Sequence, residues 1–186
     1  MRKIIISNLV SVDGYFEGPN ADISWHNINA AFNKFSIEQL HSADTILFGR
    51  KTYQLMESYW PTEAAIKNDP VIAERMNNTA KVVFSTTLRE VSWTNTRLVK
   101  NNMEQAVLQL KKQPGKDVLI FGSADFSSHL INAGLIDEFR IIISPIILGK
   151  GNLLFNRIES KVKLELIKSV PFSSGNVLLC YKPVMQ

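Results

Sequence analysis

Two short stretches of this chain combine glycine with groups that can bind phosphate. In the first turn, Gly49-Arg50-Lys51-Thr52, the glycine permits close backbone approach, two cations supply charge and the threonine supplies a hydroxyl. The second turn, Gly122-Ser123-Ala124, repeats the arrangement without the cations. Each follows an apolar run and opens a helical pattern, and helix N-termini favour anions. The two turns could hold the two ends of a dinucleotide diphosphate, although the first could equally be an ordinary strand-to-helix turn with solvated charges.

A third candidate is Asp13, which follows the first apolar run in the stretch Ser11-Val12-Asp13-Gly14-Tyr15. A carboxyl group beside an apolar pocket can have a raised pKa. A carboxyl group of that kind could act as a general acid. Asp-Gly is also a common turn dipeptide, so a chemical role and a structural role both stay open.

Other kinds of site are not indicated. His26, His41 and His129 lie far apart without metal-ligand spacing, and we interpret them as hydrogen-bonded polar residues. The single cysteine, Cys180, is expected in the core, so the sequence predicts no metal site and no disulfide. Neither a G-x-G-x-x-G after the first strand nor a P-loop motif is present.

Charge and hydropathy narrow the choice of partners. The chain has 21 Lys and Arg against 17 Asp and Glu, and these charges are scattered. This pattern predicts no nucleic-acid binding, while the small positive excess suits an anionic small-molecule substrate or simply keeps the protein soluble. No apolar run is long enough to span a membrane, and the lone cysteine fits a cytoplasmic location.

Strand-length apolar runs alternate with helix-period stretches, without repeats or linkers, which predicts one domain over residues 1–186. The expected strands are Lys3–Val10, Asp44–Phe48, Lys81–Ser85, Arg97–Val99, Asp117–Phe121, Glu138–Ser144, Lys163–Val170 and Asn176–Tyr181. The expected helices are Ala31–His41, Lys51–Tyr59, Pro70–Asn77, one from an Asn102 cap to Pro114, and Ala124–Ala133, closed by Gly134 in a left-handed cap.

This alternation predicts an α/β fold with a mostly parallel central sheet, helices on both faces and an antiparallel C-terminal edge hairpin. Asp117–Phe121 is almost wholly apolar and is expected at the centre of the sheet. Ligands of such sheets bind beyond the carboxyl ends of the strands. The first turn, the second turn and Asp13 all follow strands, so we expect them at one edge.

The chain resembles the dihydrofolate reductase-like fold and, within it, the riboflavin-biosynthesis reductase family, the C-terminal domain of a bifunctional deaminase-reductase. The resemblance runs from about Arg2 to Tyr181. Its motifs are Ser11–Tyr15, Ile46–Tyr53, Val82–Ser85, Leu119–Gly122, Gly134–Glu138 and Ser144–Gly151. The resemblance implies a three-layer α/β/α arrangement. We do not expect the deaminase half in this sequence, because it needs a His/Cys zinc cluster and the sequence has one cysteine.

The family resemblance also implies a cofactor and a set of site residues. The cofactor is NADPH, bound by Gly49, Arg50, Lys51, Thr52, Ser85, Thr86, Gly122, Ser123 and Ala124. Asp13 matches the acid beside the nicotinamide, and Gly14, Tyr15 and Trp25 match positions at the substrate. Trp25 could instead be a core aromatic residue. Tyr59, Trp60 and Trp93 could line a cleft or simply pack.

The implied activity is hydride transfer to a C=N or C=O group of a pyrimidine- or pteridine-like molecule. Reduction of 5-amino-6-(5-phosphoribosylamino)uracil is the favoured reaction, dihydrofolate reduction is second, and a nucleotide-binding module without turnover is the third possibility. A homodimer through the C-terminal hairpin and the apolar stretch Pro145–Leu148 is also expected.

Two departures from the family patterns leave the substrate open. The strand Leu119-Ile120-Phe121 lacks the carboxylate that many family members carry there. Dihydrofolate reductases place an acid on the first long helix, and the candidate here, Glu38, does not fit that spacing clearly.

Overall fold

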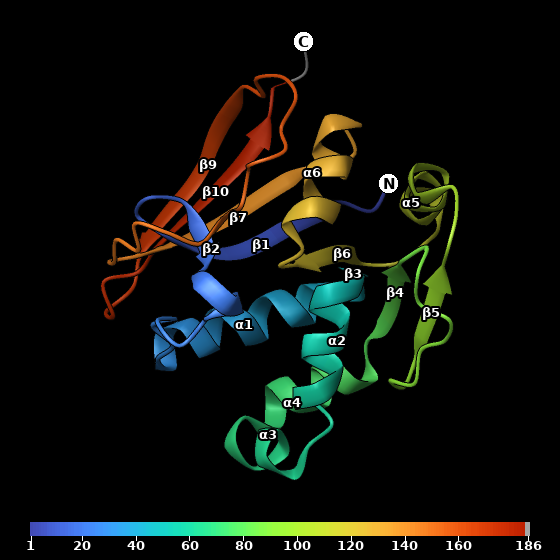
Figure 1. The fold of residues 1–186 in the computed structure, drawn as a ribbon, viewed down its shortest axis with the longest axis horizontal. Helices are drawn as coiled ribbons and strands as arrows, with labels where there is room; N and C mark the ends of the chain where they lie inside the picture. Colours follow the sequence, from blue (N-terminus) through green and yellow to red (C-terminus); the bar gives the residue numbers. More distant parts are fainter. Residues whose placement is uncertain (185–186) are drawn as a thin grey trace.

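An eight-stranded sheet with the order β5-β4-β3-β6-β1-β7-β10-β9 organises the computed structural model, which describes residues 1–184 (Figure 1). The strands are β1 Ile4–Ser11, β2 Tyr15–Glu17, β3 Ala43–Gly49, β4 Ala80–Phe84, β5 Thr96–Val99, β6 Asp117–Phe121, β7 Glu138–Ser144, β8 Asn152–Leu153, β9 Leu164–Pro171 and β10 Val177–Pro183. The helices are α1 Ala30–Ser42, α2 Arg50–Tyr59, α3 Glu63–Asn68, α4 Pro70–Asn78, α5 Met103–Lys112 and α6 Ala124–Asn132, with a 3₁₀ turn at Pro19–Ala21.

The pairing of the strands confirms the predicted sheet. The strands from β5 to β7 in this order run parallel to their neighbours, whereas β10 is antiparallel to both β7 and β9. Strand β6 lies between β3 and β1, as its apolar sequence predicts for a central strand.

Successive side chains of β1 belong to two different layers of the core, one on each face of the sheet. Ile4 and Ile6 pack with residues of α5 and α6, whereas Ile5 packs with residues of α1, α2 and α4. All three isoleucines are fully buried, because successive side chains of a strand point to opposite faces and both faces are covered. Figure 1 shows α6 and α1 on opposite sides of β1. The three-layer α/β/α arrangement is therefore confirmed.

Some local expectations were wrong or incomplete. Asn102 does not cap α5 with its side chain; its own backbone is left-handed, with φ of 54°. Gly134 does have the expected left-handed conformation, with φ of 66°. Helix α3 and the two-stranded ribbon of β2 and β8 were not predicted, since each is shorter than the periodicity a sequence pattern can reveal.

A buried lysine fixes the position of α4 against the sheet. Lys81, on β4, donates hydrogen bonds to the carbonyls of Met76, Asn77 and Thr79 at 2.7–2.9 Å and lies over the ring of Trp93. Burial lowers the pKa of Lys81 to about 8, which leaves it charged at neutral pH. The cation thus satisfies carbonyls at the C-terminal end of α4, where the helix dipole favours positive charge.

Candidate active site

The two glycine-containing turns are in direct contact at the carboxyl edge of the sheet. Leu47 pairs with Ile120, so Gly49 and Gly122, each two residues further along, reach the same level. The Gly49 N–H donates to Ser123 Oγ at 3.0 Å, and Ser123 Oγ donates to Thr52 Oγ1 at 2.7 Å. The structure therefore joins the first and second turns through one serine hydroxyl.

Glycine is required at position 49 by the closeness of this contact. A Cβ added to Gly49 would lie 2.9 Å from Ser123 Oγ and 3.1 Å from Phe126 Cβ. Gly122 and Ser123 both have left-handed backbones, with φ of 62° and 60°. This conformation is easy for glycine and unusual for serine, so the bonds of the Ser123 hydroxyl help to hold the second turn.

Strand β1 supports the second turn from the other side. The Gly122 N–H donates to Asn8 Oδ1 at 2.7 Å. Since Ser7 pairs with Phe121, the following residues Asn8 and Gly122 are adjacent by register. Asn8 is almost completely buried, and its side chain links the central strands below the second turn.

Polar and cationic groups surround the two turns. Arg50 and Lys51 begin α2 and are exposed, and Arg50 donates to Gln54 Oε1 at 3.3 Å. Phe84 pairs with Gly49, which places Ser85 and the exposed Thr86 at the same edge. Ser85 Oγ accepts from the N–H groups of its own turn, Thr87 and Leu88.

The chemistry of this edge fits a dinucleotide phosphate. Two helix N-termini, those of α2 and α6, begin at turns that approach each other closely, and the first turn carries two exposed cations, Arg50 and Lys51. Backbone N–H groups and cations are the ordinary ligands of phosphate in proteins.

An apolar cavity of about 240 Å³ lies beside the two turns. Gly122 and Thr52 form part of its wall, so the cavity begins where the turns meet. Its apolar lining includes Phe16, Ile23, Phe32, Leu40, Leu55, Met56, Trp60 and Phe121. Its polar lining includes Ser7, Asn8, Glu17, His26, Ser36, Gln39 and Thr52.

Asp13 anchors the β2–β8 ribbon rather than facing this cavity. Its Oδ1 accepts from Ser11 Oγ at 2.6 Å and from Leu148 N at 3.1 Å, and its Oδ2 accepts from Gly149 N at 2.7 Å. The hydrogen bond from Ser11, followed by those from the backbone, lowers the pKa of Asp13 despite the opposing effect of burial. The expectation of a raised pKa is therefore wrong: these donors stabilise the charged form.

The three residues matched to the substrate lie around the cavity without lining it. Gly14 and Tyr15 belong to the ribbon, whose next two residues, Phe16 and Glu17, do line the cavity. Trp25 donates its ring N–H to the Asp22 carbonyl and packs edge-on against His26, with ring centroids 4.5 Å apart. These predicted residues thus support the wall from behind.

His26 was missed by sequence reasoning. It lines the cavity and forms a hydrogen bond with the backbone of Phe16, but its Nε2 is buried without a hydrogen-bond partner. The interpretation as a hydrogen-bonded histidine therefore holds for one side of the ring only. Burial lowers the pKa of His26 more than the backbone of Phe16 and the charge of Asp22 raise it. The one available signal was its place next to Trp25, since a lone histidine carries no motif.

The aromatic residues left open by the sequence divide between the cavity and the core. Trp60 lines the cavity, whereas Trp93 is buried and stacks on Phe48, with ring centroids 6.1 Å apart. Tyr59 is exposed. Cys180 is buried, as expected.

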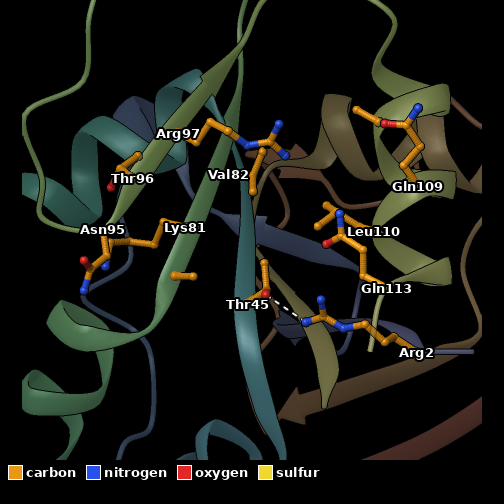
Figure 2. A pocket seen from close by; sticks show the side chains of 12 residues that line it. Arg2, Thr45, Lys81, Val82, Asn95, Thr96, Arg97, Gln109, Leu110 and Gln113 are labelled. Atoms are coloured by element: carbon orange, nitrogen blue, oxygen red, sulfur yellow. Dashed lines mark hydrogen bonds between the residues drawn. The ribbon is translucent and has the colours of Figure 1, made fainter. Parts of the chain in front are cut away.

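A larger hollow of about 530 Å³ lies near the amino-terminal ends of β3, β4 and β5 (Figure 2). Figure 2 shows Arg97 of β5 and Gln109 of α5 on opposite sides of this hollow. Its two buried cations, Arg2 and Lys81, are already paired. Arg2 donates to Asp44, to Thr45 Oγ1 at 2.8 Å and to the Lys116 carbonyl, and Lys81 donates to the three carbonyls given above. This hollow is at the wrong end of the strands for the two turns, and we take the smaller cavity as the candidate active site.

Residues 1–184 contain neither a metal-binding cluster nor a membrane-spanning helix. No group of three or more His, Cys, Asp or Glu side chains there is arranged to hold a metal ion. None of the helices in this range combines the length and hydrophobicity needed to cross a membrane.

Comparison with known proteins gives a family and a fold. Residues 2–178 match the RibD C-terminal domain family. The chain is 34% identical over 182 residues to the uncharacterized protein YyaP of Bacillus subtilis (strain 168), covering 97% of this chain and 94% of YyaP. The long match to one domain family agrees with the motifs that carry the resemblance.

Solved structures with the same fold include reductases. A putative riboflavin biosynthesis protein from Shewanella sp. PV-4 superimposes with a TM-score of 0.76 at 22% identity, over the whole of both chains. Dihydrofolate reductase from Enterococcus faecalis, complexed with NADP(H), superimposes with a TM-score of 0.66 at 14% identity, over 98% of this chain and 97% of that enzyme. At these identities the likeness shows a dihydrofolate reductase-like fold.

Proposed function

This chain belongs to the RibD C-terminal domain family, a reductase family, and on that premise we propose that it is an NADPH-dependent reductase. Its substrate is a pyrimidine- or pteridine-like small molecule that is reduced at a C=N or C=O group. The observation that carries the proposal is the contact between the two turns at the mouth of an apolar cavity. A dinucleotide held along the turns would extend its reactive ring toward that cavity.

Each part of the site has a separate task in this proposal. Gly49–Thr52 and Gly122–Ala124 bind the diphosphate through backbone N–H groups, and Arg50, Lys51, Ser85 and Thr86 surround the adenosine phosphate. The cavity excludes water from the reacting ring through its apolar walls. Bound NADPH would supply the hydride, and the heteroatom next to the reduced carbon would take a proton from water.

Asp13 has a positioning role in the proposed mechanism. Its lowered pKa keeps it ionised, so it holds the ribbon that carries Phe16 and Glu17 to the cavity. Gly14, Tyr15 and Trp25 act in the same way, behind the residues that face the substrate.

Family membership favours 5-amino-6-(5-phosphoribosylamino)uracil reduction, in riboflavin biosynthesis, as the specific activity. Dihydrofolate reduction is the second candidate. Helix α1 contributes Ser36 and Gln39 to the cavity, whereas its acid, Glu38, is exposed. An amide in place of a carboxylate tells against a charged grip on a pteridine ring. We also propose a cytoplasmic location, in which NADPH is available.

Titration with NADPH and NADH, followed by nicotinamide fluorescence, tests the cofactor assignment. We expect micromolar NADPH binding, and at least about 10-fold weaker binding of NADH, because one charge-assisted contact to the 2′-phosphate is worth that factor. Arg50→Ala should lower NADPH affinity by a similar factor and leave NADH affinity unchanged. Arg97→Ala is the matched control, since Arg97 is also exposed but lines the hollow at the opposite end of the strands. If neither cofactor binds at millimolar concentration, the reductase assignment is wrong.

A further inference from the structure

Three buried polar atoms without a hydrogen-bond partner lie on the candidate active-site cavity. They are Asn8 Nδ2, His26 Nε2 and Gln39 Oε1. Asn8 and Gln39 are each about 5% exposed, so bulk water does not satisfy them. Buried polar groups in proteins are nearly always paired, and three orphaned groups around one cavity indicate that a bound molecule completes them.

The fold determines whether one of these groups, the Asn8 side chain, offers the cavity a donor or an acceptor. Asn8 Oδ1 accepts the Gly122 N–H at 2.7 Å, and only the amide oxygen can accept. Asn8 Nδ2 is therefore the unpartnered end, and it is a donor. A ligand must present an acceptor to it, such as a ring carbonyl.

The other two groups extend the pattern. Gln39, on α1, offers an acceptor oxygen, which requires an N–H group of the ligand. His26 offers Nε2, a donor or an acceptor according to the tautomer. A cyclic amide, with a carbonyl and a ring N–H, meets the requirements of Asn8 and Gln39 together.

The charge of the lining sets a second requirement. Among residues 1–184, no Lys or Arg lines this cavity, and Glu17 is its one formally charged side chain. Lys51 and Arg75 directly precede the lining residues Thr52 and Met76, but neither of these cations lines the cavity itself. The proposed function assigns Lys51, together with Arg50, to the cofactor. A phosphate ester in the cavity would be desolvated without a counter-charge and would meet a carboxylate.

Size limits the ligand as well. The cavity of about 240 Å³ is smaller than an ordinary ligand pocket of roughly 300–1,000 Å³, and the nicotinamide ring would occupy part of it. The remaining room suits a compact planar ring. Aromatic and aliphatic side chains on its walls, including Phe32, Trp60 and Phe121, suit the faces of such a ring.

We infer that the substrate of this reductase is an uncharged, non-phosphorylated cyclic-amide heterocycle, held by Asn8, Gln39 and His26. This inference rests on the proposed function and narrows it. It replaces the phosphoribosyl substrate favoured by family membership with a neutral molecule of the same ring chemistry. Hydride adds to the carbon of a C=N bond attached to the heterocycle, which in a ribosylamino-uracil is the imine formed when the sugar ring opens. The imine nitrogen takes a proton from water, and NADPH becomes NADP⁺.

A matched pair of acceptors tests the charge requirement. 5-Amino-6-(ribosylamino)uracil and its 5′-phosphate would be compared by the loss of reduced-nicotinamide absorbance and by quenching of tryptophan fluorescence in the presence of NADP⁺. We expect kcat/KM, or the association constant if turnover is slow, to be at least about 10-fold higher for the neutral compound. Equal or better use of the phosphate overturns the inference, as does failure of both compounds to bind while NADP⁺ binds.

Substitutions at two positions test the charge requirement and the hydrogen-bond requirement separately. Leu55 lines the cavity and is 48% exposed, so Leu55→Arg can add a cation at the rim without burying it. It should raise use of the phosphate at least about 10-fold relative to the neutral compound, whereas Leu55→Gln should leave the ratio unchanged.

Asn8→Asp keeps the oxygen that accepts from Gly122 but converts the free donor into an acceptor. It should weaken binding of the neutral compound at least about 10-fold more than it weakens binding of NADPH, because Asn8 reaches the cofactor only through the Gly122 N–H.

These variants also distinguish failure of the inference from failure of the proposed function. Loss of NADPH binding in the wild-type protein would refute the reductase itself. Intact NADPH binding with an unchanged acceptor ratio in Leu55→Arg, or unchanged acceptor binding in Asn8→Asp, would refute only the neutral cyclic-amide substrate.

Discussion

At the scale of single residues, the question is whether the Asp13 carboxylate has a structural role or a catalytic one. Three donors, from Ser11, Leu148 and Gly149, hold it in the charged form. We expect Asp13→Asn to raise KM for the acceptor, because the ribbon that carries Phe16 loses its anchor, while kcat changes by less than about 10-fold. General acid catalysis by a positioned side chain is worth roughly 10²–10⁴-fold. A fall in kcat of that size, with loss of one limb of the pH profile, would show that Asp13 is the proton donor after all.

The same residue gives a stability prediction whose sign follows from its pKa. The folded protein lowers the pKa of Asp13, so the folded state releases this proton more readily than the unfolded chain. Its contribution is present at pH values above the ordinary pKa and is lost as the pH falls through the folded value. The difference in the free energy of unfolding between wild type and Asp13→Asn should thus be constant near neutral pH and shrink below about pH 4. Denaturant titrations across this range measure it, and a difference that grows on acidification would contradict it.

At the scale of elements, the contact between the first and second turns should control cofactor binding. Gly49→Ala would place a methyl group 2.9 Å from Ser123 Oγ, and overpacking of this kind costs about 1–3 kcal/mol of stability. We also expect NADPH affinity to fall at least about 10-fold, because the two helix N-termini would be pushed apart. Thermal unfolding and nicotinamide fluorescence measure the two effects.

A second substitution provides the control for this prediction. Ser123→Gly removes the hydroxyl that the new methyl group would meet and suits the left-handed backbone at that position. The double variant should regain part of the affinity lost in Gly49→Ala, although the contact with Phe126 Cβ at 3.1 Å remains. NADPH binding as tight in Gly49→Ala as in wild type would show that the turns act independently.

The strands that carry these turns could be predicted because each has a continuous apolar run. The apolar run Asp117–Phe121 predicted both the bounds of β6 and its central position in the sheet. The rule that ligands bind beyond the carboxyl ends of parallel strands predicted that Gly49 and Gly122 lie close together. The ribbon could not be predicted, since Tyr15–Glu17 and Asn152–Leu153 are too short to show alternation and are 135 residues apart at the bond between Glu17 and Asn152. The lowered pKa of Asp13 was also not predicted: its largest cause is the hydrogen bond from nearby Ser11, and its two backbone donors come from the distant residues 148 and 149.

The polar lining of the cavity was beyond sequence reasoning for a different reason. Asn8, His26 and Gln39 come from β1, a loop and α1, and no motif joins them. Asn8 lies within an apolar strand, where its orientation depends on the Gly122 N–H. Which polar atoms remain unpaired is decided by packing and rotamers, and these are fixed only when the layers of the fold close on one another.

At the scale of the whole molecule, one edge of the sheet is left uncovered. Strand β9 is exposed along most of its length, including Leu164, Leu166 and Ile167, the last two each 52% exposed. Figure 1 shows β9 at the outer edge of the sheet, away from α3 and α4. An exposed apolar edge strand is a site at which chains associate, and a homodimer through the C-terminal hairpin would cover it.

We predict a homodimer through this edge, and a single charge on β9 should then dissociate it. Closed two-fold dimers present the same patch from both chains, so Leu166→Glu would place two carboxylates in one interface. Burying unpaired charges costs several kcal/mol each, and the dissociation constant should rise at least about 100-fold. Light scattering after gel filtration should then show the mass of two chains for wild type and of one chain for the variant. Val71→Glu, on exposed α4, is the matched control and should remain dimeric. If Leu166→Glu stays dimeric, the dimer interface lies elsewhere on the protein. If the wild type is monomeric, the prediction of a dimer is wrong.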